Sequence, residues 1–172
     1  MSTLLFSLAL TIGCVPDDVD DTNTDDTQTQ DDTGTDDTGE ETPVITGDWL
    51  SEGEDVSEVL GLYGYVKVDA TFNDDGTYTV VSTDGDGATT TFSGTYTADT
   101  STDPHSIVLS QTQPSEATAE GIYAIDGTTM QYEVVQTVPD YGFTAPTPES
   151  GFGSTSGPGL SAGQNLQVFQ RQ

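Results

Sequence analysis

Positive charge is the scarcest property of this 172-residue chain. Lys67 and Arg171 are its only Lys or Arg residues, against 30 Asp and Glu residues and a formal net charge of −28. Nucleic-acid binding depends on clusters of Lys and Arg that release counterions from phosphates, and attraction to anionic lipid depends on the same groups. We therefore expect no nucleic-acid partner and no electrostatic binding to a membrane surface.

Cysteine and histidine are almost as scarce. Cys14 is the only cysteine, so no intrachain disulfide can form and a structural zinc site built from thiolates is excluded. His105, the only histidine, follows Asp103-Pro104 in a turn-like context, and nothing in the sequence marks a serine as its partner. Phosphate-binding Gly loops, dinucleotide fingerprints and metal-spaced His clusters are also missing. We predict no catalytic residue, no metal site and no cofactor, with a carboxylate-based hydrolase as an alternative.

Long hydrophobic runs are absent as well. The run from Leu4 to Ile12 is shorter than the roughly 20 residues that span a bilayer, but it has the length of a signal-peptide core. It ends at Gly13-Cys14, and this junction resembles the lipobox of bacterial lipoproteins. Two features depart from that pattern, because Thr11 stands where an aliphatic residue is usual and no basic residue precedes Leu4.

The resemblance implies that residues 1–13 are a signal peptide and that Cys14 becomes the lipid-attached first residue of the mature chain. Several acyl chains, at about 0.8 kcal/mol per buried methylene, would hold the protein on a membrane. We expect a cell-envelope location, with a weak preference for the outer membrane because Val15 rather than Asp follows the cysteine. The alternative is an N-terminal helix that buries a free thiol.

Residues 14–43 combine the cysteine with an Asp/Thr-rich repeat, such as Asp-Asp-Thr-Gln-Thr, that contains many acids, no base and few apolar side chains. Such a segment cannot bury enough surface to offset its ordering entropy, so we predict a disordered acidic tether. Asp32-Thr33-Gly34 and Asp37-Thr38-Gly39 have the triplet of aspartic proteases, but no apolar strand carries them. The ligand spacing of an EF-hand calcium loop is missing too.

Residues 44–172 have the alternating pattern and turn signals of an all-β domain. Hairpin signals such as Asp74-Asp75-Gly76 and Asp126-Gly127 separate the predicted strands. Eight strands are predicted, near 44–50, 64–73, 77–83, 88–98, 106–111, 118–125, 128–137 and 165–171. Consecutive short strands of this kind favour a single small eight-stranded antiparallel up-and-down barrel, with a two-sheet sandwich as the alternative. A short helix around 56–60 could cover one end.

Gly47-Asp48-Trp49 in the first strand and Arg171 in the last match positions that lipocalins use for a Trp packed against an Arg. The order of further short motifs is similar to a lipocalin-like domain of uncharacterised proteins common in planctomycetes and related environmental bacteria. These motifs are Asp99, Pro104, Ile107-Val108-Leu109, Gly121-Ile122-Tyr123, Asp126-Gly127 and Phe169-Gln170-Arg171. The resemblance implies a lipocalin-like barrel closed by the pair of Trp49 and Arg171. Independently of the family, an Arg stacked on an indole contributes about 0.5 to 2 kcal/mol; the alternative is that Arg171 is a solvated tail residue.

Aromatic side chains on the predicted strands are the candidates for lining the barrel: Tyr78, Phe92, Tyr96, Tyr123 and Tyr132. An eight-stranded barrel is either filled by its side chains or holds one small ligand. We therefore predict a non-enzymatic envelope lipoprotein that binds a small apolar ligand or an envelope partner. The alternative is a structural or protein-interaction module with a filled barrel, and the sequence leaves the oligomeric state open. The segment 138–163 could fold over a barrel mouth or stay unstructured.

Overall fold

The computed structural model describes residues 44–172 of the chain. The predicted signal peptide, the lipid attachment at Cys14 and the acidic tether lie outside the described residues.

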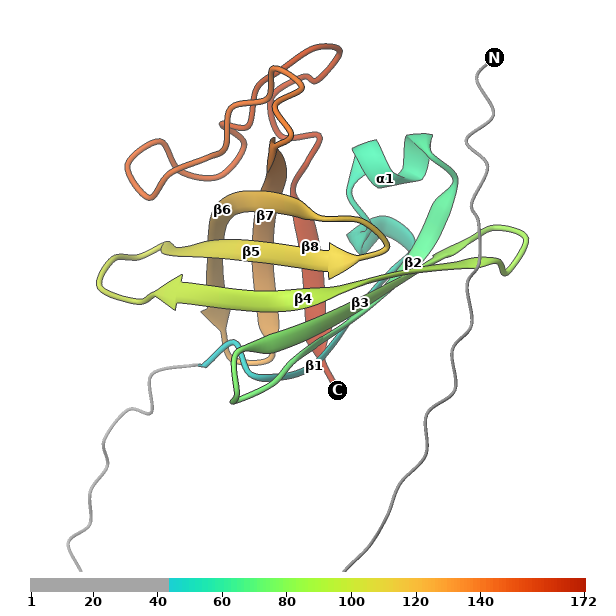
Figure 1. Cartoon of the computed structure of the whole chain (residues 1–172), viewed down its shortest axis with the longest axis horizontal. Helices are drawn as coiled ribbons and strands as arrows, with labels where there is room; N and C mark the ends of the chain where they lie inside the picture. Colours follow the sequence, from blue (N-terminus) through green and yellow to red (C-terminus); the bar gives the residue numbers. More distant parts are fainter. Residues whose placement is uncertain (1–43) are drawn as a thin grey trace, which may run out of the picture. The chain divides into compact units, whose positions relative to one another are not determined.

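The described domain is a closed barrel of eight antiparallel strands in sequential order, β1 to β8 (Figure 1). The strands are β1 (Gly47–Glu52), β2 (Tyr65–Phe72), β3 (Thr77–Asp84), β4 (Thr89–Asp99), β5 (His105–Gln113), β6 (Ala117–Asp126), β7 (Thr129–Val138) and β8 (Gln167–Arg171). The prediction of an eight-stranded up-and-down barrel is thus confirmed, and the two-sheet sandwich considered as an alternative is wrong. Closure leaves the sheet with no free edge strand along which a second chain could pair.

Alternation along each strand separates the core from the solvent. On β2, Val68, Ala70 and Phe72 are at most 3% exposed, whereas Lys67 and Asp69 on the opposite face form a surface ion pair of 2.9 Å. Side chains of successive strand residues point to opposite faces, so this pattern fixes the register of the strand against its neighbours. The inward side chains form one continuous core.

The last strand closes the barrel by pairing with the first. Trp49 of β1 lies opposite Arg171 of β8, and Leu50 lies opposite Gln170. Strand β8 begins at Gln167, two residues later than predicted, and pairs with β7 only as far as Tyr132. Beyond Tyr132, β7 stays paired with β6, and on the β8 side the side chain of Asn165 donates to the carbonyl of Val134 at 2.8 Å.

A 3₁₀ turn (Gly53–Asp55) and the short helix α1 (Glu58–Leu62) connect β1 to β2. The Ser57 hydroxyl caps α1 by accepting from the Leu60 amide at 3.4 Å. Figure 1 shows α1 at the same end of the barrel as the long connection between β7 and β8. We name this end the mouth and the end that contains Trp49 and Arg171 the base. Within residues 44–172, no helix has the length and apolar character needed to cross a membrane.

The connection between β7 and β8, residues 139–166, is ordered against the barrel. Thr144 and Ser156 form an antiparallel bridge within it. The carboxylate of Glu133, on the outer face of β7, accepts from the backbone amides of Gly153 and Thr155, the latter at 2.9 Å. Glu133 is fully buried by this contact. The sequence left two conformations open for this segment, and the structure shows a folded one.

Candidate functional site

The barrel encloses a cavity of about 240 Å³ that reaches from the middle of the barrel to the mouth. Strands β2 to β8 and helix α1 all contribute side chains to its wall. A smaller engineered protein cavity of about 150 Å³, lined by Leu, Ile and Phe, stays dry and binds benzene. The barrel therefore has room for a ligand somewhat larger than a single aromatic ring.

The inner part of the cavity is aromatic. Phe72 stacks with Tyr78 at a ring-centroid distance of 6.3 Å, and Tyr132 meets Phe169 edge to face at 5.8 Å. Phe72 also lies 6.4 Å from Tyr132, so the four rings form one connected surface. Aliphatic side chains complete the wall: Val68, Ala70, Val80, Leu109, Ala117, Ala119, Val134 and Leu60.

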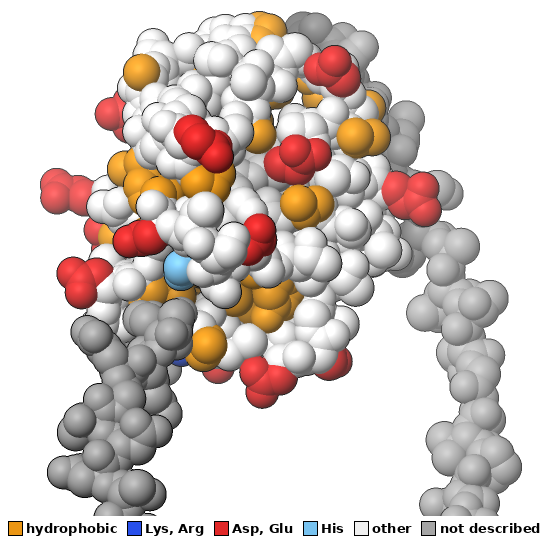
Figure 2. Space-filling view, turned by 90° about the vertical axis from the view of Figure 1, so that its left-hand side faces the viewer, with side chains coloured by type: hydrophobic (Ala, Val, Ile, Leu, Met, Phe, Trp, Pro, Cys, Tyr) orange, Lys and Arg blue, Asp and Glu red, His pale blue; other side chains and the backbone are white. Residues whose placement is uncertain are grey.

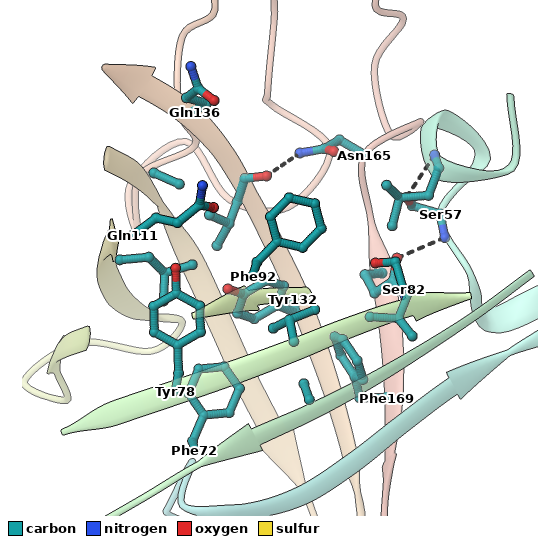
Figure 3. Close-up of a pocket in the computed structure, with 18 of the residues that line it drawn as sticks. Ser57, Phe72, Tyr78, Ser82, Phe92, Gln111, Tyr132, Gln136, Asn165 and Phe169 are labelled. Carbon is teal, nitrogen blue, oxygen red and sulfur yellow. Dashed lines mark hydrogen bonds between the residues drawn. The ribbon is translucent and has the colours of Figure 1, made fainter. Parts of the chain in front are cut away.

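The outer part of the cavity is polar but uncharged. Figure 3 shows Gln111, Gln136 and Asn165 at one end of the pocket, with Phe72, Tyr78 and Phe169 at the other. Ser57, Ser82 and Gln167 are the remaining polar residues in the wall. An apolar chamber with a few polar groups at one side is the usual composition of a small-molecule site.

Charged residues are missing from this wall, although acids dominate the chain. Among the described residues that line the cavity there is no Asp, Glu, Lys, Arg or His. Figure 2 shows the acidic side chains spread over the outside of the barrel instead. A charged ligand would find no counter-charge in the cavity, so the site suits an uncharged molecule.

The cavity exists because several inward-facing residues of the barrel are small. The inward positions of β6 near the mouth are Ala117 and Ala119, and Ala70 faces inward from β2. Gly121, the next inward position of β6, has no room for a side chain, because a Cβ there would lie 2.0 Å from the carbonyl oxygen of Glu133. Close approach of β6 to β7 and small side chains on β6 together leave space inside.

Gln167 at the start of β8 joins the cavity to the helix above it. Its side-chain oxygen accepts from the backbone amide of Ser57 at 3.0 Å. Since a backbone amide can only donate, this bond fixes the orientation of the Gln167 amide group. Gln167 is 4% exposed, and its Nε2 has no hydrogen-bond partner within the described part of the chain.

Burial changes the acidity of the tyrosines inside the barrel. It raises the pKa of Tyr132 far above its usual range, with a smaller contribution from nearby Tyr78, and it also raises the pKa of Tyr78. Both hydroxyls therefore stay protonated and neutral at physiological pH.

Three of the five predicted lining residues contribute to the cavity, and two do not. Tyr78, Phe92 and Tyr132 line it. Tyr123 is fully buried outside the cavity wall, where burial raises its pKa to about 12. Tyr96 packs edge to face on Phe72 at 5.1 Å, and its hydroxyl donates to the carbonyl of Asn73 at 3.0 Å. Tyr96 and Tyr123 thus support the floor of the cavity.

The other residues of the wall were not predicted from the sequence. Phe72 and Phe169 could have been found, because each lies in phase with the alternation of its strand. The glutamines could not, since polar residues on a strand are ordinarily taken as facing solvent. The mouth of the barrel is polar, unlike a core filled with apolar side chains, because three glutamines face inward there: Gln111, Gln136 and Gln167.

The structure brings Trp49 and Arg171 into direct contact at the base. The guanidinium carbon of Arg171 lies 4.2 Å from the centroid of the Trp49 ring. Arg171 also donates to the carbonyls of Thr46 at 2.8 Å and Val44 at 2.6 Å, while the Trp49 indole donates to Ile45 at 2.7 Å. The solvated-tail interpretation of Arg171 is wrong, because the side chain ties the first described residues to the last strand.

His105 begins β5, where its ring meets that of Tyr123 at 5.1 Å and its Nδ1 contacts the carbonyl of Thr102. It does not line the cavity. Within residues 44–172, no group of three or more His, Cys, Asp or Glu side chains is placed to hold a metal ion.

Aromatic residues of the connection 139–166 do not enter the cavity. Tyr141 is 62% exposed, and neither Phe143 nor Phe152 belongs to the cavity wall. Asn165 is the residue of this connection that does. Of residues 139–166, only Asn165 therefore contributes to the cavity wall.

No family model matches the sequence, and neither the curated proteins nor the solved structures contain a match to it.

Proposed function

We propose that this chain is a lipid-anchored envelope protein whose barrel binds a small, uncharged and largely apolar ligand. The observation that carries the proposal is the cavity of about 240 Å³ with an aromatic interior and no charged side chain among its described lining residues. In a chain with 30 acids, a wall without charge favours apolar contents over polar or ionic ones. Catalysis forms no part of this proposal.

Binding is tested with 1-aminonaphthalene, a neutral two-ring dye whose emission moves to shorter wavelength in apolar surroundings. The full chain carrying Cys14→Ser, which needs no detergent, should bind the dye and shift its emission. Ala119→Phe places a ring in the cavity and should abolish the shift, whereas Ala98→Phe changes an exposed position and should not. Absence of binding by the unblocked chain, or equal binding by both Phe variants, would contradict a ligand site in the barrel.

The anchor is supported by the hydrophobic run before Gly13-Cys14 and by the acidic repeat that follows. Intact mass of the protein extracted from membranes gives the direct test. We expect a chain that begins at Cys14 and carries acyl groups, and a Cys14→Ser chain without them. An unmodified chain that retains Met1 would remove the anchor from the proposal and leave the ligand site untouched.

A second candidate function is a protein-interaction module. Leu62 and Tyr63 at the end of α1 are 76% and 79% exposed, and Val66 at the start of β2 is 49% exposed. Apolar side chains exposed next to one another are typical of contact surfaces. A photo-crosslinker placed at Tyr63 that yields one defined adduct in cells, combined with no dye binding, would favour this function over a ligand carrier.

A further inference from the structure

Gln167 has a hydrogen-bond donor for which residues 44–172 supply no acceptor. Its Oε1 is occupied by the amide of Ser57, and its Nε2 is unpaired although the side chain is 4% exposed. A buried donor without a partner costs roughly 1 to 3 kcal/mol, and native proteins rarely leave one. Among the described residues of the cavity wall, Gln167 is the one with a buried polar atom that has no hydrogen-bond partner.

The other glutamine amides of the wall are already engaged. Gln136 Nε2 donates to the carbonyl of Pro139 at 3.2 Å, and Gln111 Nε2 donates to that of Ser115 at 2.9 Å. The Asn165 amide is used on Val134. Gln167 therefore differs from three similar side chains at the same mouth, and packing alone does not account for its unpaired group.

We infer that Gln167 Nε2 recognises a hydrogen-bond acceptor on the ligand, so that the ligand is a neutral molecule with an aromatic or aliphatic body and one carbonyl or ether oxygen. This inference rests on the proposed binding function and specifies its chemistry. The body would lie against Phe72, Tyr132 and Phe169, and its oxygen would face β8. A carboxylate is disfavoured, because the wall has no cation among its described residues and the chain carries a net charge of −28.

The test compares two probes of nearly equal shape, acetophenone and isopropylbenzene, by isothermal titration of the full chain carrying Cys14→Ser. The readout is the ratio of their affinities, because the ratio cancels any general weakening of the site. Replacing Gln167 with Leu should shift this ratio by about threefold to tenfold against the ketone, the effect of one neutral hydrogen bond. Gln131→Leu is the matched control and should leave the ratio unchanged, because Gln131 is exposed on β7 and lies outside the cavity wall.

A second variant separates ligand recognition from the bond that holds the helix. Gln167→Glu keeps an oxygen for the Ser57 amide, and above the pH at which its buried carboxyl ionises it cannot donate, so at that pH it should also disfavour the ketone. An unchanged ratio in both Gln167 variants would overturn the inference while leaving the binding function intact. If neither probe binds the unmodified site, this inference and the proposed function both fail.

Discussion

Arg171 has an unusual position for one of only two cations in the chain. It stacks on the single tryptophan and donates to two backbone carbonyls upstream of β1. Gly47 leaves room for the Arg171 guanidinium, because a Cβ at position 47 would lie only 2.9 Å from Arg171 Nη1. Two sequence-distant segments, residues 44–49 and the end of β8, therefore meet at one guanidinium, which makes the base of the barrel depend on this side chain.

Replacing Arg171 with Leu should destabilise the domain by about 1 to 3 kcal/mol, from the lost stacking and the lost charge-assisted hydrogen bonds. Urea unfolding followed by the emission of Trp49, which is 1% exposed, measures this directly. Arg171→Lys should fall between Leu and the native chain, because an ammonium keeps the charge without the planar fork. Lys67→Ala removes the other cation from an exposed ion pair and should change stability little. A loss for Lys67→Ala as large as for Arg171→Leu would contradict this account.

At the scale of elements, the outer wall of the barrel holds the longest connection in place through one carboxylate. Glu133 accepts from two backbone amides, those of Gly153 and Thr155, and is fully buried beside them. Its cross-strand neighbour on the outer face, Ile122, is also fully buried. Glu133 and Ile122 face outward from the barrel, and they are buried because the connection between β7 and β8 folds over them.

Glu133→Gln should loosen this connection, because an amide group offers one acceptor oxygen where the carboxylate offers two. We expect faster hydrogen exchange at Gly153 and Thr155 and faster chymotrypsin cleavage beside Tyr141 and Phe152. The loss of stability should be about 1 to 3 kcal/mol, the cost of an unpaired buried amide. Glu120→Gln, an exposed acid on the neighbouring strand, is the matched control and should behave like the native chain. Unchanged exchange in Glu133→Gln would show that other contacts hold the connection.

The limits of sequence-based prediction follow from the same elements. Strand order and closure were predictable, because the alternation on strands such as β2 and the Asp-Gly turns specify a meander. The role of Glu133 was not, since its partners lie 20 and 22 residues away and are backbone amides without a sequence signature. Gln167 escaped prediction for a similar reason, because its partner Ser57 is 110 residues distant.

At the scale of the whole molecule, the base and the mouth differ in the residues that they contain. The described chain enters at the base, where Arg171 contacts Val44, whereas Gln167 and Asn165 mark the mouth at the far end of β8. Residue 44 and the polar mouth thus lie at opposite ends of the described barrel.

The interior of the barrel also links its stability to alkaline pH. The pKa values of Tyr78, Tyr96, Tyr123 and Tyr132 are all raised, in each case mainly by burial, and that of Tyr123 reaches about 12. Unfolded tyrosines lose their protons near pH 10. Between these values the unfolded state has lost protons that the folded state still holds, so stability that is complete below about pH 10 falls as the pH rises toward 12.

Tyr123→Phe should reduce this alkaline loss, because it keeps the ring and removes one ionisable group. Near neutral pH the variant should match or exceed the native chain in stability, since the Tyr123 hydroxyl is buried with no partner within the described residues. Urea unfolding across the alkaline range, read beside the phenolate absorbance, gives both quantities. Tyr132→Phe tests the same effect inside the cavity, where the raised pKa has the same cause. If both variants lost stability with pH as steeply as the native chain, burial of these hydroxyls would not be what limits the barrel at high pH.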